Sequence, residues 1–274
     1  MQPNAAKAAT ARPGKTEGSA SFDLGPPLLR KAVGKSLPAL AIAATAFLAL
    51  ATPALAGDRA LIEFIGFSED SRYFAFEEFG IQDGSGFAYS SIYIVDLTTD
   101  SWVLGTPIRV QANDEAAALS QIRAEVNLQA AEDIETLGID VPAEIVALVG
   151  DGSPDSDAQT LRFGSPGYGP GEVSGNYELQ LSSFPTTAAA PCQEWFAVDP
   201  LGYELSIIDG ASERLLHRDT TLPRSRGCPA TYRLYGVVLP FNAGSIGQAV
   251  GIVSVYPGSF EGPDRRFIAV PLGL

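Results

Sequence analysis

The chain has 274 residues and a formal net charge of −14, with 18 basic side chains, 32 acidic side chains and a single His. The first 56 residues carry six of the basic and two of the acidic side chains, so residues 57–274 hold 12 Arg against 30 Asp or Glu, a net charge of −18. Nucleic acids and anionic membranes bind through clustered Lys and Arg, and no Lys follows Lys35. The composition therefore argues against both as partners of residues 57–274.

The start of the chain has the pattern of an export signal. Residues 1–29 are rich in Ala, Gly, Pro and Ser and show no hydrophobic periodicity, which predicts a disordered preamble. Residues 30–56 then place basic side chains, an apolar run and the small-residue sequence Ala54-Leu55-Ala56 in that order. This order is typical of a secretory signal peptide.

A retained transmembrane anchor is the alternative interpretation of the apolar run. Residues 37–56 are just long enough to span a bilayer. The run is dominated by Ala, is interrupted by two prolines and ends in a cleavage signature, which favours a cleaved Sec-type signal. We therefore expect cleavage after Ala56 and a periplasmic or secreted domain of residues 57–274.

The first half of this domain changes from strand to helix periodicity. Residues 60–103 contain apolar and alternating runs separated by Gly- and Asp-containing turns, which predicts β-strands. Residues 114–137 instead carry apolar side chains at every third or fourth position, which predicts one amphipathic helix. Asn113 or Asp114 can cap its start, and Gly138 can end it.

The second half returns to β structure after an irregular stretch. Residues 142–149 are a candidate for a second, shorter helix, and the Gly-, Pro-, Ser- and Asp-rich residues 150–175 are expected to form a flexible loop. A β meander is expected over residues 176–271. Its clearest strands are residues 177–184, 203–208, 232–239, 249–256 and 266–270. The predicted fold is mainly β with one amphipathic helix, in the α+β class, with antiparallel sheets arranged as a sandwich or as part of a propeller.

Two cysteines remain after the signal, Cys192 and Cys228. An even number of cysteines in an exported chain favours a disulfide, and two buried thiols are the alternative. Closing this loop would stabilise the fold by roughly 4 kcal/mol on the chain-entropy model. Two cysteines and the single His217 are too few ligands for a zinc site. Because the domain contains no Lys, it has neither a phosphate-binding loop nor a Schiff-base lysine, and no cofactor is predicted.

Two resemblances emerge from short motifs. Residues 68–76 and 92–97 resemble one blade of the TolB-type WD40-like propeller. Taken whole, residues 61–271 resemble a family of predicted secreted proteins, the domain of unknown function family 2259. The matching runs are residues 67–70, 79–87, 222–229 and 260–267. The family resemblance implies export and a Cys pair, and it assigns no reaction and no functional residue.

Arginines in two turn-rich segments are the most distinctive polar residues of this acidic domain. The candidate binding residues are Arg224, Arg226, Glu261, Asp264, Arg265 and Arg266. Arg recognises carboxylates and phosphates through paired hydrogen bonds, and loops on a β scaffold commonly carry binding residues. The alternative is internal ion pairing with the two acidic members of the set. The first interpretation predicts a contact surface for an envelope protein or a glycan.

Catalytic motifs are missing from the sequence. His217 and Asp219 provide half of a nucleophilic triad, but no Gly-x-Ser-x-Gly elbow supplies a serine. No catalytic residue is assigned, and a non-catalytic binding or structural module is the favoured interpretation. The alternative is a hydrolase whose site is assembled from loops and includes His217 and carboxylates.

Export processing gives the first testable prediction. The mature protein recovered outside the cytoplasm should begin at Gly57, because the signal peptidase site follows Ala56. N-terminal sequencing combined with the intact mass of the exported protein measures this directly. A membrane-bound product that retains residues 37–56 would contradict the prediction.

Overall fold

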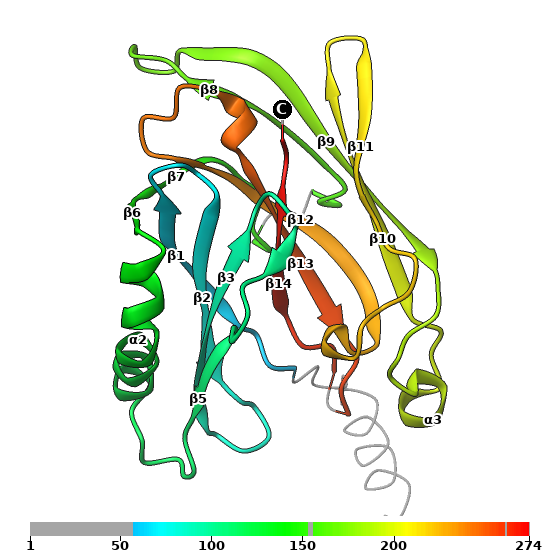
Figure 1. Cartoon of the computed structure of the whole chain (residues 1–274). Coiled ribbons are helices and arrows are strands. Elements are labelled where there is room, and N and C mark those ends of the chain that lie inside the picture. Colours follow the sequence, from blue (N-terminus) through cyan, green and yellow to red (C-terminus); the bar gives the residue numbers. More distant parts are fainter. Residues whose placement is uncertain (1–56, 153–155, 261, 274) are drawn as a thin grey trace, which may run out of the picture. The chain divides into compact units, whose positions relative to one another are not determined.

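The computed structural model describes residues 57–152, 156–260 and 262–273 (Figure 1). The expected preamble, signal peptide and cleavage site lie outside the described residues. Within these residues, no helix is long and apolar enough to cross a membrane. The described fold is mainly β, with three antiparallel sheets.

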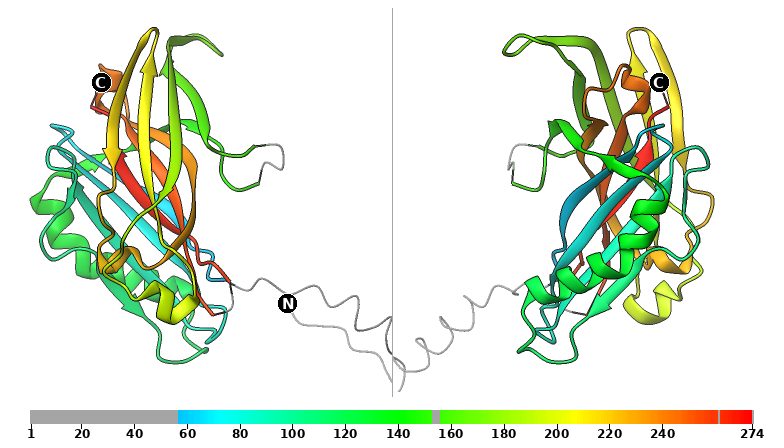
Figure 2. Two further views of the ribbon diagram at one scale, coloured as in Figure 1. Left: turned by 90° about the vertical axis from the view of Figure 1, so that its right-hand side faces the viewer. Right: turned by 60° about the vertical axis from the view of Figure 1, so that its left-hand side comes forward.

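The first sheet, called here the helix-side sheet, has six strands in the order β4-β3-β2-β1-β6, with β5 also paired to β3. Its strands are β1 (Leu61–Ser68), β2 (Tyr73–Ile81), β3 (Ala88–Asp96), β4 (Ser101–Trp102), β5 (Ile108–Gln111) and β6 (Ile139–Val141). The four strands β1–β4 form an antiparallel meander, which includes residues 68–76 and 92–97 of the propeller-blade resemblance. The other two sheets stack on it face to face instead of repeating it around an axis (Figure 2).

The middle sheet has the order β14-β13-β12-β7. Its strands are β7 (Ala143–Leu148), β12 (Pro229–Pro240), β13 (Val250–Pro257) and β14 (Arg266–Pro271). The hairpin sheet has the order β11-β10-β9-β8, with β8 (Thr160–Pro166), β9 (Val173–Pro185), β10 (Leu201–Asp209) and β11 (Ser212–Arg218). The expected meander of residues 176–271 is thus divided between two sheets.

The middle sheet is buried on both faces. Successive side chains of a strand point to opposite faces. On β13, Val253 and Val255 pack in the core shared with the hairpin sheet. Val250 and Ile252 pack in the core shared with the helix-side sheet. Strands buried on both faces are apolar without interruption, which explains why these strands are the clearest in the sequence.

Helix α2 (Leu119–Thr136) covers the outer face of the helix-side sheet (Figure 1). Val126 and Ala130 pack against Ile92 and Ile94 of β3. The helix buries only a narrow stripe of side chains, and the described residues contain a second, short helix, α3 (Cys192–Phe196). The expectation of one amphipathic helix is therefore not confirmed in detail.

Helix α2 begins five residues later than predicted. The side chain of Asp114 accepts hydrogen bonds from the backbone N–H groups of Ala116 at 2.9 Å and Ala117 at 3.1 Å, which holds a turn in front of the helix. Ala118 is extended, so the helix starts after it. Gly138 follows the helix with a φ of 63°, the left-handed conformation that glycine adopts without strain, and it ends the helix as predicted.

Two predictions for the middle of the chain are wrong. Residues 142–149, the candidate for a second, shorter helix, contain β7 instead, because pairing with β12 outweighs the weak local helix pattern. Residues 150–175 were expected to form a loop but contain β8 and the start of β9, which pair with each other. Glycines tolerate the close backbone approach there: a Cβ on Gly164 would lie 2.7 Å from the carbonyl oxygen of Ser174.

The two buried faces of the middle sheet yield a stability prediction. Leu234→Ala on the face toward the hairpin sheet and Ile252→Ala on the opposite face should each lower the free energy of unfolding by about 2–5 kcal/mol. Leu128→Ala on α2, where the side chain is 79% exposed, is the control and should change it by less than about 0.5 kcal/mol. Urea unfolding measures all three variants. A loss confined to one face would contradict the middle position of the sheet.

Candidate functional site

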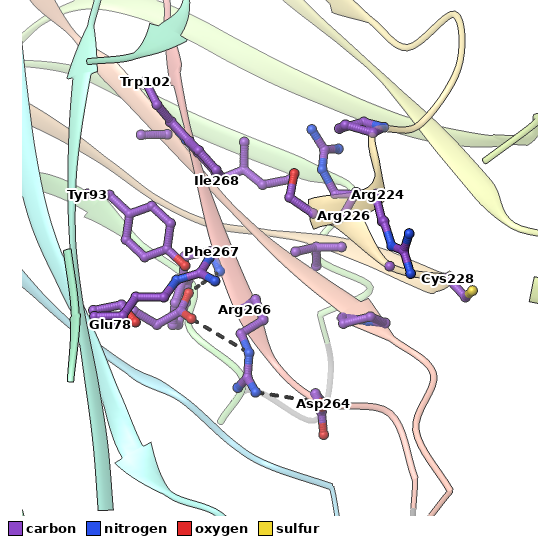
Figure 3. A pocket seen from close by; sticks show the side chains of 18 of the residues that line it. Glu78, Tyr93, Trp102, Arg224, Arg226, Cys228, Asp264, Arg266, Phe267 and Ile268 are labelled. Carbon is purple, nitrogen blue, oxygen red and sulfur yellow. Dashed lines mark hydrogen bonds and ion pairs between the residues drawn. The ribbon is translucent and has the colours of Figure 1, made fainter. Parts of the chain in front are cut away.

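A cavity of about 680 Å³ lies at the edge strand β14 of the middle sheet. Side chains of β2, β3, β4 and β5 form one wall, called here the sheet wall. The other, called here the turn wall, is formed by α3, by the 3₁₀ turn η1 (Arg224–Arg226) and by the disulfide cysteine Cys228. Figure 3 shows Tyr93 and Glu78 on one side and Arg224 and Arg226 on the other, with Phe267 and Ile268 of β14 between them.

Strand alternation places the sheet wall. Tyr89 and Tyr93 of β3 face the middle sheet and the cavity, whereas Ile92 and Ile94 face α2. On β2 the same alternation turns Glu78 inward, while Glu77 reaches Arg123 of α2 at 2.7 Å. The polar groups of the sheet wall are therefore side chains at the inward-facing positions of β2 and β3.

The disulfide holds the turn wall in place. Cys192 at the start of α3 and Cys228 after η1 are bonded, with their Cα atoms 5.5 Å apart, so the predicted disulfide is confirmed. Trp195 and Phe196 of α3 and the whole of η1 line the cavity. The bond thus joins two chain segments that both contribute to this wall.

A buried carboxyl group lies under β14. The Oε2 atom of Glu78 accepts a hydrogen bond from the backbone N–H of Phe267 at 2.9 Å, and Oε1 lies 3.7 Å from Nε of Arg266. Burial raises the pKa of Glu78 to about 7, even though Arg266 and the Phe267 N–H favour the charged form. Glu78 therefore satisfies an N–H group at the open edge of the middle sheet.

Arg266 is held by several groups at once. Its guanidinium donates to the hydroxyl of Tyr89 at 3.0 Å and lies 3.6 Å from Asp264 and 3.5 Å from Asp58. Internal pairing, the alternative considered from the sequence, thus describes Arg266. Its side chain still lines the cavity, as does that of Asp264.

His217 stands between two carboxylates. Its Nε2 lies 3.1 Å from Asp219 and its Nδ1 lies 3.5 Å from Asp100, which precedes β4 and so bridges the helix-side and hairpin sheets. Its ring stacks on Tyr203, with centroids 4.6 Å apart. Burial alone would lower the pKa of His217, but the two carboxylates outweigh burial and raise it to about 9. The imidazole is therefore protonated at neutral pH.

Two buried donor groups at the cavity lack acceptors. Nη1 of Arg226 and the hydroxyl of Tyr203 have no hydrogen-bond partner among the described residues. Arg226 lies 3.5 Å from Asp219, which is an ion pair without a hydrogen bond. Both Arg226 and Tyr203 line the cavity. A buried donor without an acceptor costs about 1–3 kcal/mol, and both atoms are closed to solvent, so the two donors lie behind the exposed lining of the cavity.

The lining of the cavity is richer in arginine, relative to acidic residues, than the domain as a whole. The lining contains four of the 12 arginines of residues 57–274, namely Arg109, Arg224, Arg226 and Arg266, but only three of the 30 acidic residues, namely Glu78, Asp100 and Asp264. Arg109 and Arg224 are exposed and have no ion-pair partner in the part of the chain that the structure describes. The cavity mouth is therefore a cationic region of a strongly anionic domain.

The sequence-predicted residues separate into two groups. Arg224, Arg226, Asp264 and Arg266 all line the cavity. Arg265 points elsewhere: it is buried, pairs with Asp151 and donates to the carbonyl of Ala60 at 2.9 Å. Neighbouring residues of extended backbone point to opposite sides, which separates Arg265 from Arg266. Glu261 lies outside the described residues.

Sequence reasoning missed Arg109, Trp102, Tyr203 and Glu78. Trp102 and Arg109 lie on short strands whose alternation is too brief to show a face, and Tyr203 and Glu78 look like ordinary strand residues. One signal was available, because the chain contains only two Trp and both line the cavity. A half-exposed Trp next to a cavity is more informative than a buried one.

The fold and the cavity define a class: a mainly β protein of three stacked antiparallel sheets with an arginine-lined cavity at the edge of the middle sheet. No group of side chains among the described residues is arranged to hold a metal ion. The chain belongs to the family described as predicted secreted protein (DUF2259), whose family model matches residues 75–272. No curated protein and no solved structure matches the chain.

The His217 cluster predicts a pH-dependent stability. The pKa of His217 is raised in the folded state, so its contribution to stability is complete below pH 6.5 and is lost as the pH rises through about 9. Between these pH values the free energy of unfolding should fall by about 2 kcal/mol more in the wild type than in His217→Gln, allowing for partial solvent screening. Urea unfolding at several pH values measures this.

The comparison of the two proteins isolates His217, since it is the only His of the chain and Glu78 titrates equally in both. If the free energy of unfolding changed with pH in the same way in the wild type and in His217→Gln, the two carboxylates would not stabilise the protonated imidazole.

Proposed function

We propose that residues 57–274 form an exported, non-catalytic binding protein that takes an anionic ligand into the cavity at β14. Membership of a family of predicted secreted proteins supports export, and a Sec-type signal cleaved after Ala56 would deliver the domain to the periplasm or the medium. The predicted contact surface comprises the Arg224–Arg226 turn and the Pro257–Arg266 hairpin loop, and the lining of the cavity by residues of both segments supports the proposal.

The cationic lining of the cavity carries this proposal. The Arg226 guanidinium is fixed by its ion pair to Asp219 and by its position over the Tyr203 ring, 5.4 Å from the ring centroid. This guanidinium is therefore positioned before a ligand arrives, which lowers the entropy cost of binding. A carboxylate or phosphate accepts charge-assisted hydrogen bonds from guanidinium groups such as those of the cavity lining.

Electrostatics supports the same choice of ligand. A domain with a net charge of −18 repels anions from most of its surface. Arg109 and Arg224 at the mouth reverse that potential locally, and the low-dielectric walls of the cavity strengthen their effect. An anion therefore gains more in this cavity than elsewhere on the domain.

The hydrolase alternative finds less support at the same site. A histidine that is protonated at neutral pH does not accept a proton, so His217 is not a general base under those conditions. Its neighbours within 3.5 Å that could pair with it are the carboxylates of Asp100 and Asp219, which are not hydroxyl nucleophiles. His217 instead serves to orient Asp219 and, through it, Arg226.

Calorimetric titration with carboxylates and with their neutral amides tests the proposal. Acetate, hexanoate, benzoate and glucuronate serve as anionic probes, and hexanamide and benzamide are the neutral counterparts. We expect the anions to bind and the amides not to bind. Arg224→Ala should weaken anion binding about tenfold, because one charge-assisted contact is worth about 1.4 kcal/mol or more.

Arg162→Ala provides the matched control, since Arg162 is an exposed arginine of β8 that pairs with Glu178 away from the cavity. It should bind the probes as the wild type does. Equal losses in Arg162→Ala and Arg224→Ala would attribute binding to net charge alone and overturn the site. The absence of binding by every anion would overturn the proposed function.

A further inference from the structure

We infer that the ligand of this cavity is an anion that carries a six-membered ring, held between two walls that each supply one half-exposed Trp and one exposed Arg. The inference rests on the proposed function and narrows its ligand class. The shared chemistry is a carboxylated ring, found in free aromatic acids and in the acidic sugars of glycans.

The sheet wall presents Trp102 and Arg109. Trp102 is 46% exposed, and it meets Tyr93 edge to face with ring centroids 5.4 Å apart. Strand β4 pairs Trp102 with Val95, and strand β5 pairs Arg109 with Ser91 on the same strand β3. Four residues of strand separate these two positions, about 13 Å of backbone. The sheet wall thus has an aromatic end at Trp102 and a cationic end at Arg109. The distance between these two ends is comparable to the length of a drug-sized molecule.

The turn wall repeats this pairing with different elements. Trp195 of α3 is also 46% exposed, and Arg224 of η1 is exposed. The Cys192–Cys228 bond links the two segments that carry them, because Cys192 is in the same short helix as Trp195 and Cys228 follows η1. Both side chains therefore project from segments that are tied together.

Half-exposed tryptophans at a cavity favour a ring as ligand. A Trp side chain that is half exposed to water gains only part of the free energy that full burial would provide. A six-membered ring regains that burial by placing its face against the Trp, and for an aromatic ring the contact contributes beyond its area. A cavity of about 680 Å³ has the size of drug-like ligand sites, so an inorganic anion alone would leave most of it unfilled.

Polar groups deeper in the cavity orient such a ligand. Arg226 lines the cavity and adds a guanidinium charge that attracts the carboxylate. Glu78 and Asp264 line the same cavity and offer acceptors for hydroxyl substituents of the ring. Donors, acceptors and aromatic faces in one cavity match a hydroxylated ring acid better than an aliphatic acid.

Intrinsic fluorescence tests the inference directly, because the only two Trp of the chain both line the cavity. Benzoate and glucuronate are compared with hexanoate, a ringless anion of the same charge, by fluorescence and by calorimetry. We expect at least one of the two ring anions to bind tenfold tighter than hexanoate and to change the Trp emission. Tighter binding of benzoate assigns a free aromatic acid, and tighter binding of glucuronate assigns an acidic sugar.

Variants separate the ring contact from the charge contact. Trp102→Leu and Trp195→Leu should each weaken binding of the preferred ring anion about fivefold and leave hexanoate unchanged, whereas Arg224→Ala should weaken both. Tyr168→Leu is the control, since Tyr168 is a fully exposed aromatic residue outside the cavity. Far-UV circular dichroism verifies the fold of each variant.

The comparison of wild-type affinities needs no variant to fold. Hexanoate binding as tightly as both ring anions would overturn the ring inference and leave the proposed function standing. Failure of every anion to bind would overturn both. Loss of ring-anion binding in Tyr168→Leu equal to that in the Trp variants would also overturn the assignment of the ring to the two walls.

Discussion

Burial of both faces of the middle sheet is the constraint on which the structure depends. Strands β12, β13 and β14 present apolar side chains alternately to the hairpin sheet and to the helix-side sheet. A strand buried on both sides has no solvent face, so other sheets must cover it. The chain meets this requirement with two separate sheets, and α2 then covers the remaining face of the helix-side sheet.

The cavity follows from where this stacking ends. Strand β14 is an edge strand, and residues from both of its faces, Arg266 and Ile268 on one and Phe267 and Ala269 on the other, line the cavity. The outer sheets extend past β14 and meet where Asp100 approaches His217. The exposed edge that would otherwise invite strand pairing is thus enclosed, and Glu78 occupies one of its N–H groups.

The sequence predicts the parts of this fold that depend on local patterns. Uninterrupted apolar strands, the helix stop at Gly138 and the disulfide were all predictable, because each needs only neighbouring residues or a count of cysteines. Strands β7 and β8 were not, since their conformation depends on pairing with β12 and β9. The Arg224–Arg226 turn, predicted from the sequence as a candidate binding segment, lines the cavity, and its binding role stays a prediction. Arg109, its counterpart on the sheet wall, lies more than 100 residues away in the sequence. Only the register of β5 on β3 places Arg109 at the cavity.

The position of the disulfide determines when the turn wall of the cavity is completed. Both cysteines lie in segments that build the turn wall, so the covalent tether and the wall form together. Thiols stay reduced in the cytoplasm and pair in oxidising compartments. A chain still inside the cell therefore lacks the tether of one wall of its cavity. In a chain that is exported, as the family description predicts, the bond would form after translocation and would complete this wall in the compartment of delivery.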